Sequence, residues 1–416
     1  MLKVFKFGGA SVKDADGVRN LKKILQIYKG ESVLVVISAM GKMTNQLEKL
    51  LDSWYFTPES LQRNFETVKN FHLDIASQLE NNTGEITAVL TPILNRLLEI
   101  LSGPHSNHYD KDYDDIVSFG EYLSTKLIST YLNLNGFDNV FACALNLVKT
   151  DDTFREGKVN WEETEKAICE FVAKHPNKTI ITQGFIGGTS NGEVTTLGRE
   201  GSDFSAAIFA YCLNAKEVTI WKDVAGLLNA DPKFYPDAVK LDTISYQEAI
   251  ELAYYGATII HPKTIKPLQN KNIPLLVKSF LSPTNEGSMI GHGEPPEKIP
   301  SYIFKTEQIL LSIFPKDFSF IAADNLTKIF SYISKNKLKI NLMQNSAVSF
   351  TICIDNKPNR FANLLKDLEE EFSVKYNMNK KLITIRHYTP ESIEKVIGSQ
   401  PVILEQKSRV TLQVVI

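Results

Sequence analysis

Hydrophobic positions in the first forty residues follow strand and helix patterns in turn. Apolar residues and lysines alternate over residues 2–7, the apolar spacing of 12–28 is helical, and a nearly continuous apolar run follows at 33–40. A strand, a helix and a second buried strand in this order form a βαβ unit, whose two strands are parallel. The pattern therefore predicts that the chain begins with a parallel sheet.

A buried strand followed by a glycine-containing turn returns twice further along the chain. The segments are 179–187, TIITQGFIG, and 217–232, EVTIWKDVAGLLNADP. Each places loop residues at the carboxyl end of its strand, and open α/β sheets bind ligands at that edge. We therefore expect functional residues from distant parts of the sequence to gather there.

From about residue 295 the order of elements becomes βαββαβ, which is typical of a ferredoxin-like α+β domain with helices on one face of an antiparallel sheet. Residues 381–416 resemble a second copy that is cut short, because the helix and strand that would complete it are missing. Unpaired strand edges favour association. We expect this tail to pair with the first copy or with another subunit.

Composition narrows the class of protein. The chain has 416 residues, 43% of them hydrophobic and 23% charged, and a formal net charge of −2. These values exclude a disordered chain and give no general attraction to nucleic acid or an acidic membrane. No apolar run reaches the roughly 18 residues of a membrane span, and the four cysteines form no CxxC pair. We expect a cytoplasmic protein of two or three folded units.

Lys6, Gly8 and Gly9 form the first candidate site, a lysine at the end of a buried strand with two glycines before a helix. Glycines let backbone N–H groups approach a phosphate, the helix N-terminus adds a positive dipole, and lysine adds full charge. Neither GxxxxGK[ST] nor GxGxxG occurs in the chain. Taken alone, a plain tight turn explains this pattern more simply.

Residues 198–203, GREGSD, form the second candidate at the start of an apolar helix. Arg199 could hold a carboxylate with two parallel hydrogen bonds, and Asp203 could orient a lysine or a cation. In the simpler alternative, Ser202 or Asp203 is only an N-cap.

Other polar positions are also open to structural explanations. Asp223 and Asp231 lie in a predicted turn, where aspartates are common without any ligand. Glutamates such as Glu121 are common in the first turn of a helix. His261 has no second metal ligand at suitable spacing, so a structural role is favoured. No single motif decides the function.

The order of the motifs does decide it, because the chain resembles the aspartate kinases of the amino acid kinase family over about residues 1 to 290. The tail resembles the ACT regulatory domains of that family. The segments that carry the resemblance are KFGGAS at 6–11, SAM at 38–40 with Thr44, FGE at 119–121, TQGFIG at 182–187, TTLGREGSD at 195–203, WKDVAGLLNADP at 221–232 and YGATIIHPKT at 255–264.

The resemblance implies a three-layer αβα sandwich for residues 1–295, an ACT-like ferredoxin-like domain at 303–380 and a shortened second ACT-like unit at 381–416. It implies transfer of phosphate from ATP, with Mg²⁺, to the side-chain carboxylate of L-aspartate. The product is 4-phospho-L-aspartate, at the start of lysine, threonine and methionine synthesis. No metal ligand of the protein itself is predicted, and we expect a homodimer formed through the ACT-like sheets.

The resemblance also implies roles for single residues. Lys6 would contact the transferred phosphate, Asp203 would organise the reacting centre without abstracting a proton, and Gly8 and Gly9 would line the phosphate turn. Arg199 would bind the α-carboxylate of aspartate. The other expected residues are Glu121 for the ammonium group, Ser38, Thr44, Gly201 and Ser202 beside aspartate, Lys222, Asp223, Asp231, Lys233 and Thr258 at ATP, and Asn341, Gln344, Asn345 and Ser346 at an amino-acid effector site.

Two other functions stay open on the sequence alone. Another acyl-phosphate-forming kinase of the same family, such as a glutamate 5-kinase, would use the same charged residues. An amino-acid sensor with an inactive kinase domain would rely on the ACT-like part. The presence of Lys6, Glu121, Arg199 and Asp203 argues against the sensor.

Overall fold

The computed structural model describes residues 2–80, 83–257, 260–293, 298–317 and 319–416. The chain forms two compact units. The first contains residues 1–227, 240–250 and 260–295, and the second contains residues 228–239, 251–259 and 296–416. The sequence predicts divisions at 295, 303 and 381, and these boundaries stay predictions.

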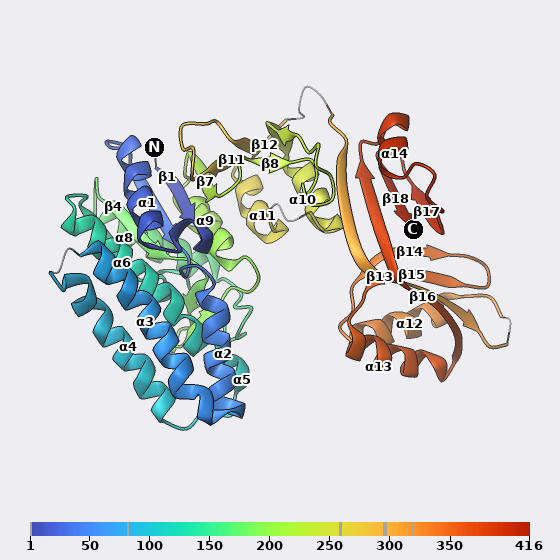
Figure 1. The fold of residues 1–416 in the computed structure, drawn as a ribbon, viewed down its shortest axis with the longest axis horizontal. Helices are drawn as coiled ribbons and strands as arrows, with labels where there is room; N and C mark the ends of the chain where they lie inside the picture. Colours follow the sequence, from blue (N-terminus) through green and yellow to red (C-terminus); the bar gives the residue numbers. More distant parts are fainter. Residues whose placement is uncertain (1, 81–82, 258–259, 294–297, 318) are drawn as a thin grey trace. The chain divides into compact units, whose positions relative to one another are not determined.

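The first unit contains an eight-stranded sheet in the order β10-β12-β11-β7-β1-β2-β4-β3 (Figure 1). Its strands pair in parallel except for β11 with β12, so the sheet is mixed and mainly parallel. The strands are β1 (Lys3–Phe7), β2 (Val33–Ile37), β3 (Asn139–Ala142), β4 (Thr179–Gln183), β7 (Glu217–Lys222), β10 (Thr243–Ser245), β11 (Leu275–Ser279) and β12 (Ser288–Gly291).

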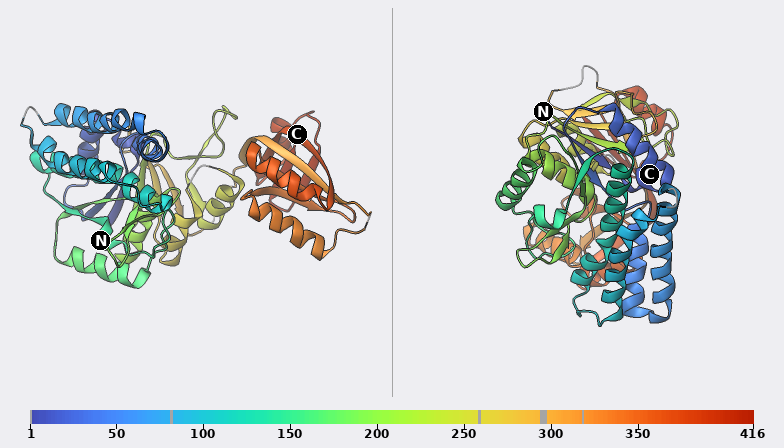
Figure 2. Two further views of the ribbon diagram at one scale, coloured as in Figure 1. Left: turned by 90° about the horizontal axis from the view of Figure 1, so that it is seen from below. Right: turned by 90° about the vertical axis from the view of Figure 1, so that its left-hand side faces the viewer.

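Helices cover both faces of this sheet because side chains alternate along each buried strand. Phe5 and Phe7 of β1 enter a core that contains residues of α1, α3, α4 and α6. Helix α9 also packs on β1, and α8 and α11 pack against α9. Figure 2 shows α2, α3 and α4 running side by side. The helices are α1 (Ala15–Ile27), α2 (Met43–Phe56), α3 (Leu61–Leu79), α4 (Glu85–Ser102), α5 (Tyr109–Val117), α6 (Phe119–Leu134), α8 (Trp161–Ala173), α9 (Gly201–Cys212), α10 (Tyr246–Tyr255) and α11 (Pro262–Asn270).

The predicted three-layer αβα sandwich is therefore confirmed. Shorter elements complete the connections: η1 (Gly9–Val12), η2 (Pro58–Ser60), α7 (Ala144–Leu147), β5 (Ile186–Gly188), β6 (Val194–Thr196), β8 (Leu227–Leu228) and β9 (Lys240–Leu241). In the part of the chain that the structure describes, no helix combines the length and the apolar character needed to cross a bilayer.

The second unit contains a six-stranded antiparallel sheet in the order β14-β15-β13-β16-β18-β17. Helices α12 and α13 pack on one face of its first four strands through an apolar core of aliphatic side chains and phenylalanines. The elements are β13 (Ser301–Pro315), α12 (Ala323–Lys335), β14 (Ile340–Asn345), β15 (Phe350–Asp355), α13 (Pro358–Glu369), β16 (Phe372–Arg386), α14 (Pro390–Val396), β17 (Leu404–Lys407) and β18 (Thr411–Val415). The ferredoxin-like α+β arrangement is confirmed.

The second ACT-like copy differs from the prediction that it lacks a strand. Residues 301–305, the first part of β13, pair antiparallel with residues 382–386 of β16. They supply the fourth strand of the second copy, while the rest of β13 serves the first copy. The expected pairing of the tail with the first copy is confirmed, because β13 and β16 pair along both copies and join them in one sheet. The sequence missed this strand because its partner lies about eighty residues away.

Candidate active site

The turns that follow β1 and β2 are pressed together at the carboxyl edge of the parallel sheet. The Gly41 N–H donates to the carbonyl of Gly9 at 2.9 Å, and the Ser38 N–H donates to the carbonyl of Phe7 at 3.1 Å. A Cβ on Gly9 would lie 2.6 Å from the Gly41 carbonyl oxygen and 2.8 Å from that of Ala39. Only glycine fits at position 9, so the two glycines of the first candidate site have a steric reason beyond turn formation.

Lys6 meets the start of α9 at this edge. Its Nζ lies 2.6 Å from Oδ1 of Asp203, and the two side chains are only 12% and 6% exposed. The absence of a side chain at Gly8 leaves space beside this ammonium group, since a Cβ at position 8 would lie 3.1 Å from Nζ of Lys6. Charges interact strongly where water is mostly excluded. The structure therefore joins the first two candidate sites in one ion pair.

Glu121 lies in the first turn of α6 and is 2% exposed. Its Oε1 accepts a hydrogen bond of 3.1 Å from the Ala39 N–H, and its Oε2 has no hydrogen-bond partner among the described residues. Burial raises the pKa of Glu121 to about 8, partly offset by the Ala39 N–H and the positive charge of Lys6. A buried carboxylate with one unbonded oxygen is suited to receive a cationic group.

Gly120 explains how Glu121 comes so close to the turn after β2. A Cβ at position 120 would lie 2.8 Å from the Ala39 Cβ and 3.1 Å from Cδ1 of Leu47. The FGE motif thus combines a close approach of α6 with a carboxylate aimed at the backbone of that turn. Any larger residue at position 120 would push Glu121 away.

The GREGSD turn packs against the turn after β4. A Cβ on Gly201 would lie 2.6 Å from Cδ2 of Phe185, and a Cβ on Gly184 would lie 2.7 Å from Cβ of Ser202. The Leu197 N–H donates to the Phe185 carbonyl at 2.8 Å. The TQGFIG turn is predicted from the sequence to lie at a strand end, but no residue in it is predicted to belong to the site. Its signal was the glycine at the end of a strand, and the contact itself comes from tertiary structure.

Arg199 is exposed and makes no hydrogen bond or ion pair with the described part of the chain. Ser38, Thr44 and Ser202 are partly exposed. The contacts therefore bring together Lys6, Gly8, Gly9, Glu121, Gly201 and Asp203. The guanidinium group of Arg199 stays available to bind a ligand.

The residues predicted at ATP are more scattered. Lys222 ends β7 one residue after the partner of Phe7, so it lies at the same edge as Gly8. Asp223 follows it and is exposed. Asp231 and Lys233 belong to the second unit, where Oδ1 of Asp231 accepts from the Lys233 N–H. Thr258 lies outside the described residues. The assignment of these five to ATP stays a prediction.

The predicted effector residues lie on and after the edge strand β14. The side chains of Gln344, Asn345 and Ser346 are exposed, and Ser346 bonds Ser349. Asn341 differs, because its amide donates to Gln308 and Asp355 and accepts from Lys305. His261 has the structural role that was favoured, since its Nδ1 accepts from the Lys263 N–H at the start of α11.

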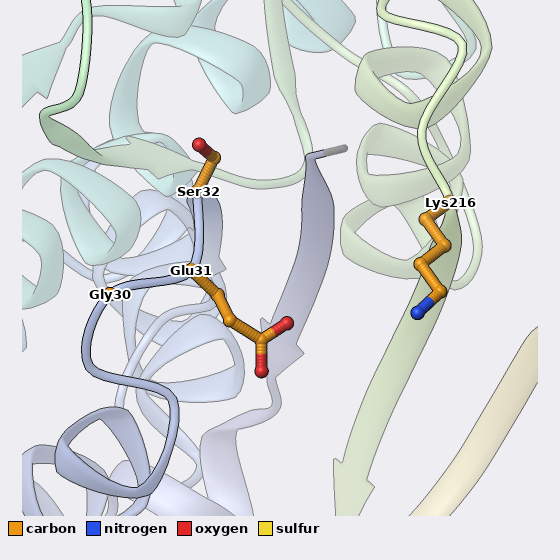
Figure 3. A pocket seen from close by; sticks show the side chains of 4 residues that line it. All are labelled: Gly30, Glu31, Ser32 and Lys216. Atoms are coloured by element: carbon orange, nitrogen blue, oxygen red, sulfur yellow. The ribbon is translucent and has the colours of Figure 1, made fainter.

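A pocket of 370 Å³ lies at the opposite edge of the parallel sheet, lined by Gly30, Glu31, Ser32 and Lys216 (Figure 3). These residues precede β2 and β7, so they mark the amino ends of the strands. Lys3 at that end pairs with Glu31 at 2.7 Å. The pocket contains none of the predicted site residues.

Comparison with known proteins shows the family to which the chain belongs. A sequence model of the amino acid kinase family matches residues 1–279. The chain therefore belongs to the amino acid kinase family. Aspartokinase 2, chloroplastic, of Arabidopsis thaliana is 30% identical over 412 residues, which cover 92% of this chain and 73% of that protein. Within the family, the chain is thus a member of the aspartokinases.

Solved structures agree on the fold. The crystal structure of E. coli aspartokinase III in complex with lysine and aspartate has a TM-score of 0.85 at 24% identity, covering 100% of this chain and 96% of that one. The same enzyme in complex with aspartate and ADP has a TM-score of 0.84 at the same identity and coverage. At this identity the likeness shows the fold.

Proposed function

We propose that this chain transfers a phosphoryl group from ATP to the side-chain carboxylate of L-aspartate, forming 4-phospho-L-aspartate for lysine, threonine and methionine synthesis. The observation that carries the proposal is the Lys6–Asp203 ion pair beside the buried, half-bonded carboxylate of Glu121. Membership of the aspartokinases supports it, as do aspartate and ADP in the E. coli structure.

The reaction requires positively charged groups that stabilise the phosphoryl oxygens, and it does not require a general base. A carboxylate with a pKa of about 3.9 is already ionised at neutral pH, so the acceptor needs no proton removed. The difficulty is that an anion must approach a polyphosphate and charge must spread over the phosphoryl oxygens. Lys6 and the backbone N–H groups of the Gly8–Gly9 turn would stabilise that charge, and Asp203 would hold the ammonium group of Lys6 in place.

Aspartate would be recognised through its ammonium group and its α-carboxylate, each bound by a side chain of opposite charge. The substrate ammonium group would replace the missing partner of Glu121, and the exposed guanidinium of Arg199 would bind the α-carboxylate. Ser38, Thr44, Gly201 and Ser202 would line the space between them. Each of these assignments uses a residue at the carboxyl edge of the sheet.

ATP would lie beside the Gly8–Gly9 turn, with Lys222, Asp223, Asp231, Lys233 and Thr258 as further contacts. Mg²⁺ usually binds through substrate phosphates with one or two protein carboxylates. Among the described residues no three His, Cys, Asp or Glu side chains form a metal-binding group. This donor set fits a magnesium ion that arrives with ATP and meets at most the carboxylate of Asp203. Such an ion would neutralise phosphate charge.

Trapping the acyl phosphate with hydroxylamine tests the proposal directly. We expect hydroxamate formation to require ATP and to be about 100-fold faster with aspartate than with glutamate, because the extra methylene of glutamate would move its side-chain carboxylate away from the phosphoryl group once its ammonium group and α-carboxylate are bound. The Lys6→Met variant supplies the background rate. Faster turnover of glutamate would indicate the other acyl-phosphate kinase, and amino-acid binding without turnover would indicate a sensor.

We further propose a homodimer formed through β14, which is an edge strand of its sheet. Met343 on this strand and Val348 after it are about half exposed, and unpaired strand edges favour pairing with a second chain. Light scattering that gave only the mass of one chain would contradict the dimer. A cytoplasmic location is supported by four free cysteines, and cell fractionation would test it.

A further inference from the structure

Asp114 is a fully buried acidic residue of α5. Its Oδ1 accepts a hydrogen bond of 2.7 Å from the hydroxyl group of Thr196. Its Oδ2 accepts from the backbone N–H of Thr196 at 2.9 Å and from that of Arg155 at 2.8 Å. Burying a carboxylate costs free energy unless hydrogen-bond donors replace the lost water. These three bonds therefore meet that need and hold the backbone at positions 155 and 196 against α5.

The segment that Asp114 holds leads directly to Arg199. Thr196 is the last residue of β6, and the backbone N–H of Gly157 donates to its carbonyl oxygen at 2.9 Å. Gly198 has a φ of 74°, and a Cβ there would lie 3.3 Å from the carbonyl oxygen of Arg155. The backbone before Arg199 is thus fixed by α5 and one loop, whereas its guanidinium group has no partner among the described residues.

The backbone of Asp114 connects to the start of α6. Its carbonyl oxygen accepts from the Ser118 N–H at 3.2 Å, and the carbonyl oxygen of Ser118 accepts from the Glu121 N–H at 3.0 Å. Asp114 therefore reaches Glu121 through two backbone hydrogen bonds and the Arg199 turn through its side chain. These are the two residues proposed to bind the ammonium group and the α-carboxylate of aspartate.

We propose that Asp114 is a positioning residue for the amino-acid substrate, and that it sets the distance between Glu121 and Arg199. A small ligand bound at both ends requires this distance to be accurate, because a displacement of about 1 Å can cost up to about 100-fold in rate. Asp114 itself contacts no ligand in this role. The role rests on the proposed function for the identity of the ligand.

Asp114→Asn tests this role, because one acceptor oxygen cannot serve three donors. The KM for aspartate should rise about tenfold, with kcat and the KM for ATP within about threefold of the wild type. Asp112→Asn is the matched control on the same helix. Asp112 is also buried and accepts from the Ser106 N–H at 2.8 Å and the Tyr55 hydroxyl at 2.5 Å, so the KM for aspartate should change less than about twofold. An equal rise in both variants, or no rise in Asp114→Asn, would overturn the proposal.

A double-substitution cycle shows whether Asp114 acts through Arg199. In an Arg199→Met background no guanidinium group remains to be positioned, so Asp114→Asn should lower kcat/KM for aspartate less than about twofold further. In the wild-type background it should lower this value about tenfold. Equal fold losses in both backgrounds would overturn the proposal. Thr196→Val removes only the hydroxyl donor and should lower kcat/KM about threefold.

Two measurements need no turnover. Asp114→Asn should speed amide hydrogen exchange in peptides covering residues 195–199 and leave peptides covering α1 unchanged. Calorimetric titration with L-aspartate should give a Kd about tenfold higher than that of the wild type. Both results in a chain that forms no acyl phosphate would overturn the proposed function and keep the role of Asp114. Unchanged exchange and unchanged Kd in an active aspartokinase would overturn this role alone.

Discussion

The carboxyl edge of the kinase sheet and strands β13, β14 and β15 of the C-terminal sheet each contain a polar cluster around a buried side chain, but only the second cluster is satisfied internally. Gln308, which is 2% exposed, bonds Asp355 and Asn341, and Asn341 also accepts from Lys305. Glu121 at the kinase edge has one oxygen without a partner in the described part of the chain. A completed network stabilises a fold, whereas an incomplete one marks a place that a ligand can complete.

The largest effect is expected at the kinase edge, from substitution of Lys6. Lys6→Met should lower kcat about 100- to 1,000-fold, the size typical of losing one preorganised group that stabilises transition-state charge. Lys3→Met is the matched control on the same strand. Lys3 pairs with Glu31 and Glu217 at the opposite edge, so kcat should change less than about twofold. Steady-state kinetics with saturating ATP and aspartate measures both.

Near-normal turnover of the Lys6→Met enzyme would contradict the role of this edge as the place of phosphoryl transfer. A similar loss in both variants would indicate damage to β1 and not to the site, which thermal unfolding would reveal.

The next effect concerns the unpaired oxygen of Glu121. Glu121→Gln removes the negative charge that would bind the ammonium group, so the KM for aspartate should rise at least about tenfold. In the wild type, the KM for aspartate should fall as the pH rises toward 8 and above, because the carboxyl group with its pKa of about 8 then ionises. Initial rates between pH 6.5 and 9.5 measure this, and the variant should lose the pH dependence of KM.

Whereas aspartate binding should improve as the pH rises, the stability of the folded protein should decrease. The folded pKa of Glu121 is raised above its ordinary value of 4.5, so the folded protein binds more protons than the unfolded chain between about pH 4.5 and pH 8. The contribution of this group to the free energy of unfolding should therefore fall across that window, by at most about 1 kcal/mol per pH unit. In Glu121→Gln this contribution disappears. Urea unfolding at several pH values compares the two, and identical slopes would contradict the assignment.

The smallest effect tests the satisfied network. Gln308→Ala would leave the side chains of Asn341 and Asp355 with unmet hydrogen bonds, so the free energy of unfolding of the second unit should fall by about 1–3 kcal/mol. The same substitution at Gln344, exposed on β14, should change it by less than about 0.5 kcal/mol. Calorimetric unfolding of both variants measures the difference, and kcat should stay within about twofold in each.

An equal loss of stability at Gln308 and Gln344 would show that the buried network contributes nothing special. A large loss of kcat at Gln308 would show that the two kinds of polar cluster are not separate in function.

Much of the site followed from sequence because its signals are local. Glycines at 8, 9 and 201 and the charges at 6, 199 and 203 stand at strand ends and helix starts, where turn chemistry is readable from a few neighbouring residues. The family and the fold of both regions are confirmed. The role of each residue stays a prediction, since composition and order do not give distances.

The missing parts depended on long-range contacts. Pairing of residues 301–305 with 382–386 cannot be read from either segment alone, because edge pairing is set by the whole sheet. The same holds for the Lys6–Asp203 ion pair and the closed network around Asn341. A glutamate in a first helical turn is ordinary in sequence, and only its burial removes the water that would complete its hydrogen bonds.

Taken by itself, the sequence determined which chemical groups this aspartokinase can bring to a sheet edge, because strand periodicity and glycine turns are local properties of the chain. The tertiary structure alone decided which of those groups meet and which are left without a partner. Burial and hydrogen-bond partners are properties of packed neighbours, and the partners of Glu121, Asp203 and Asn341 come from other segments of the chain.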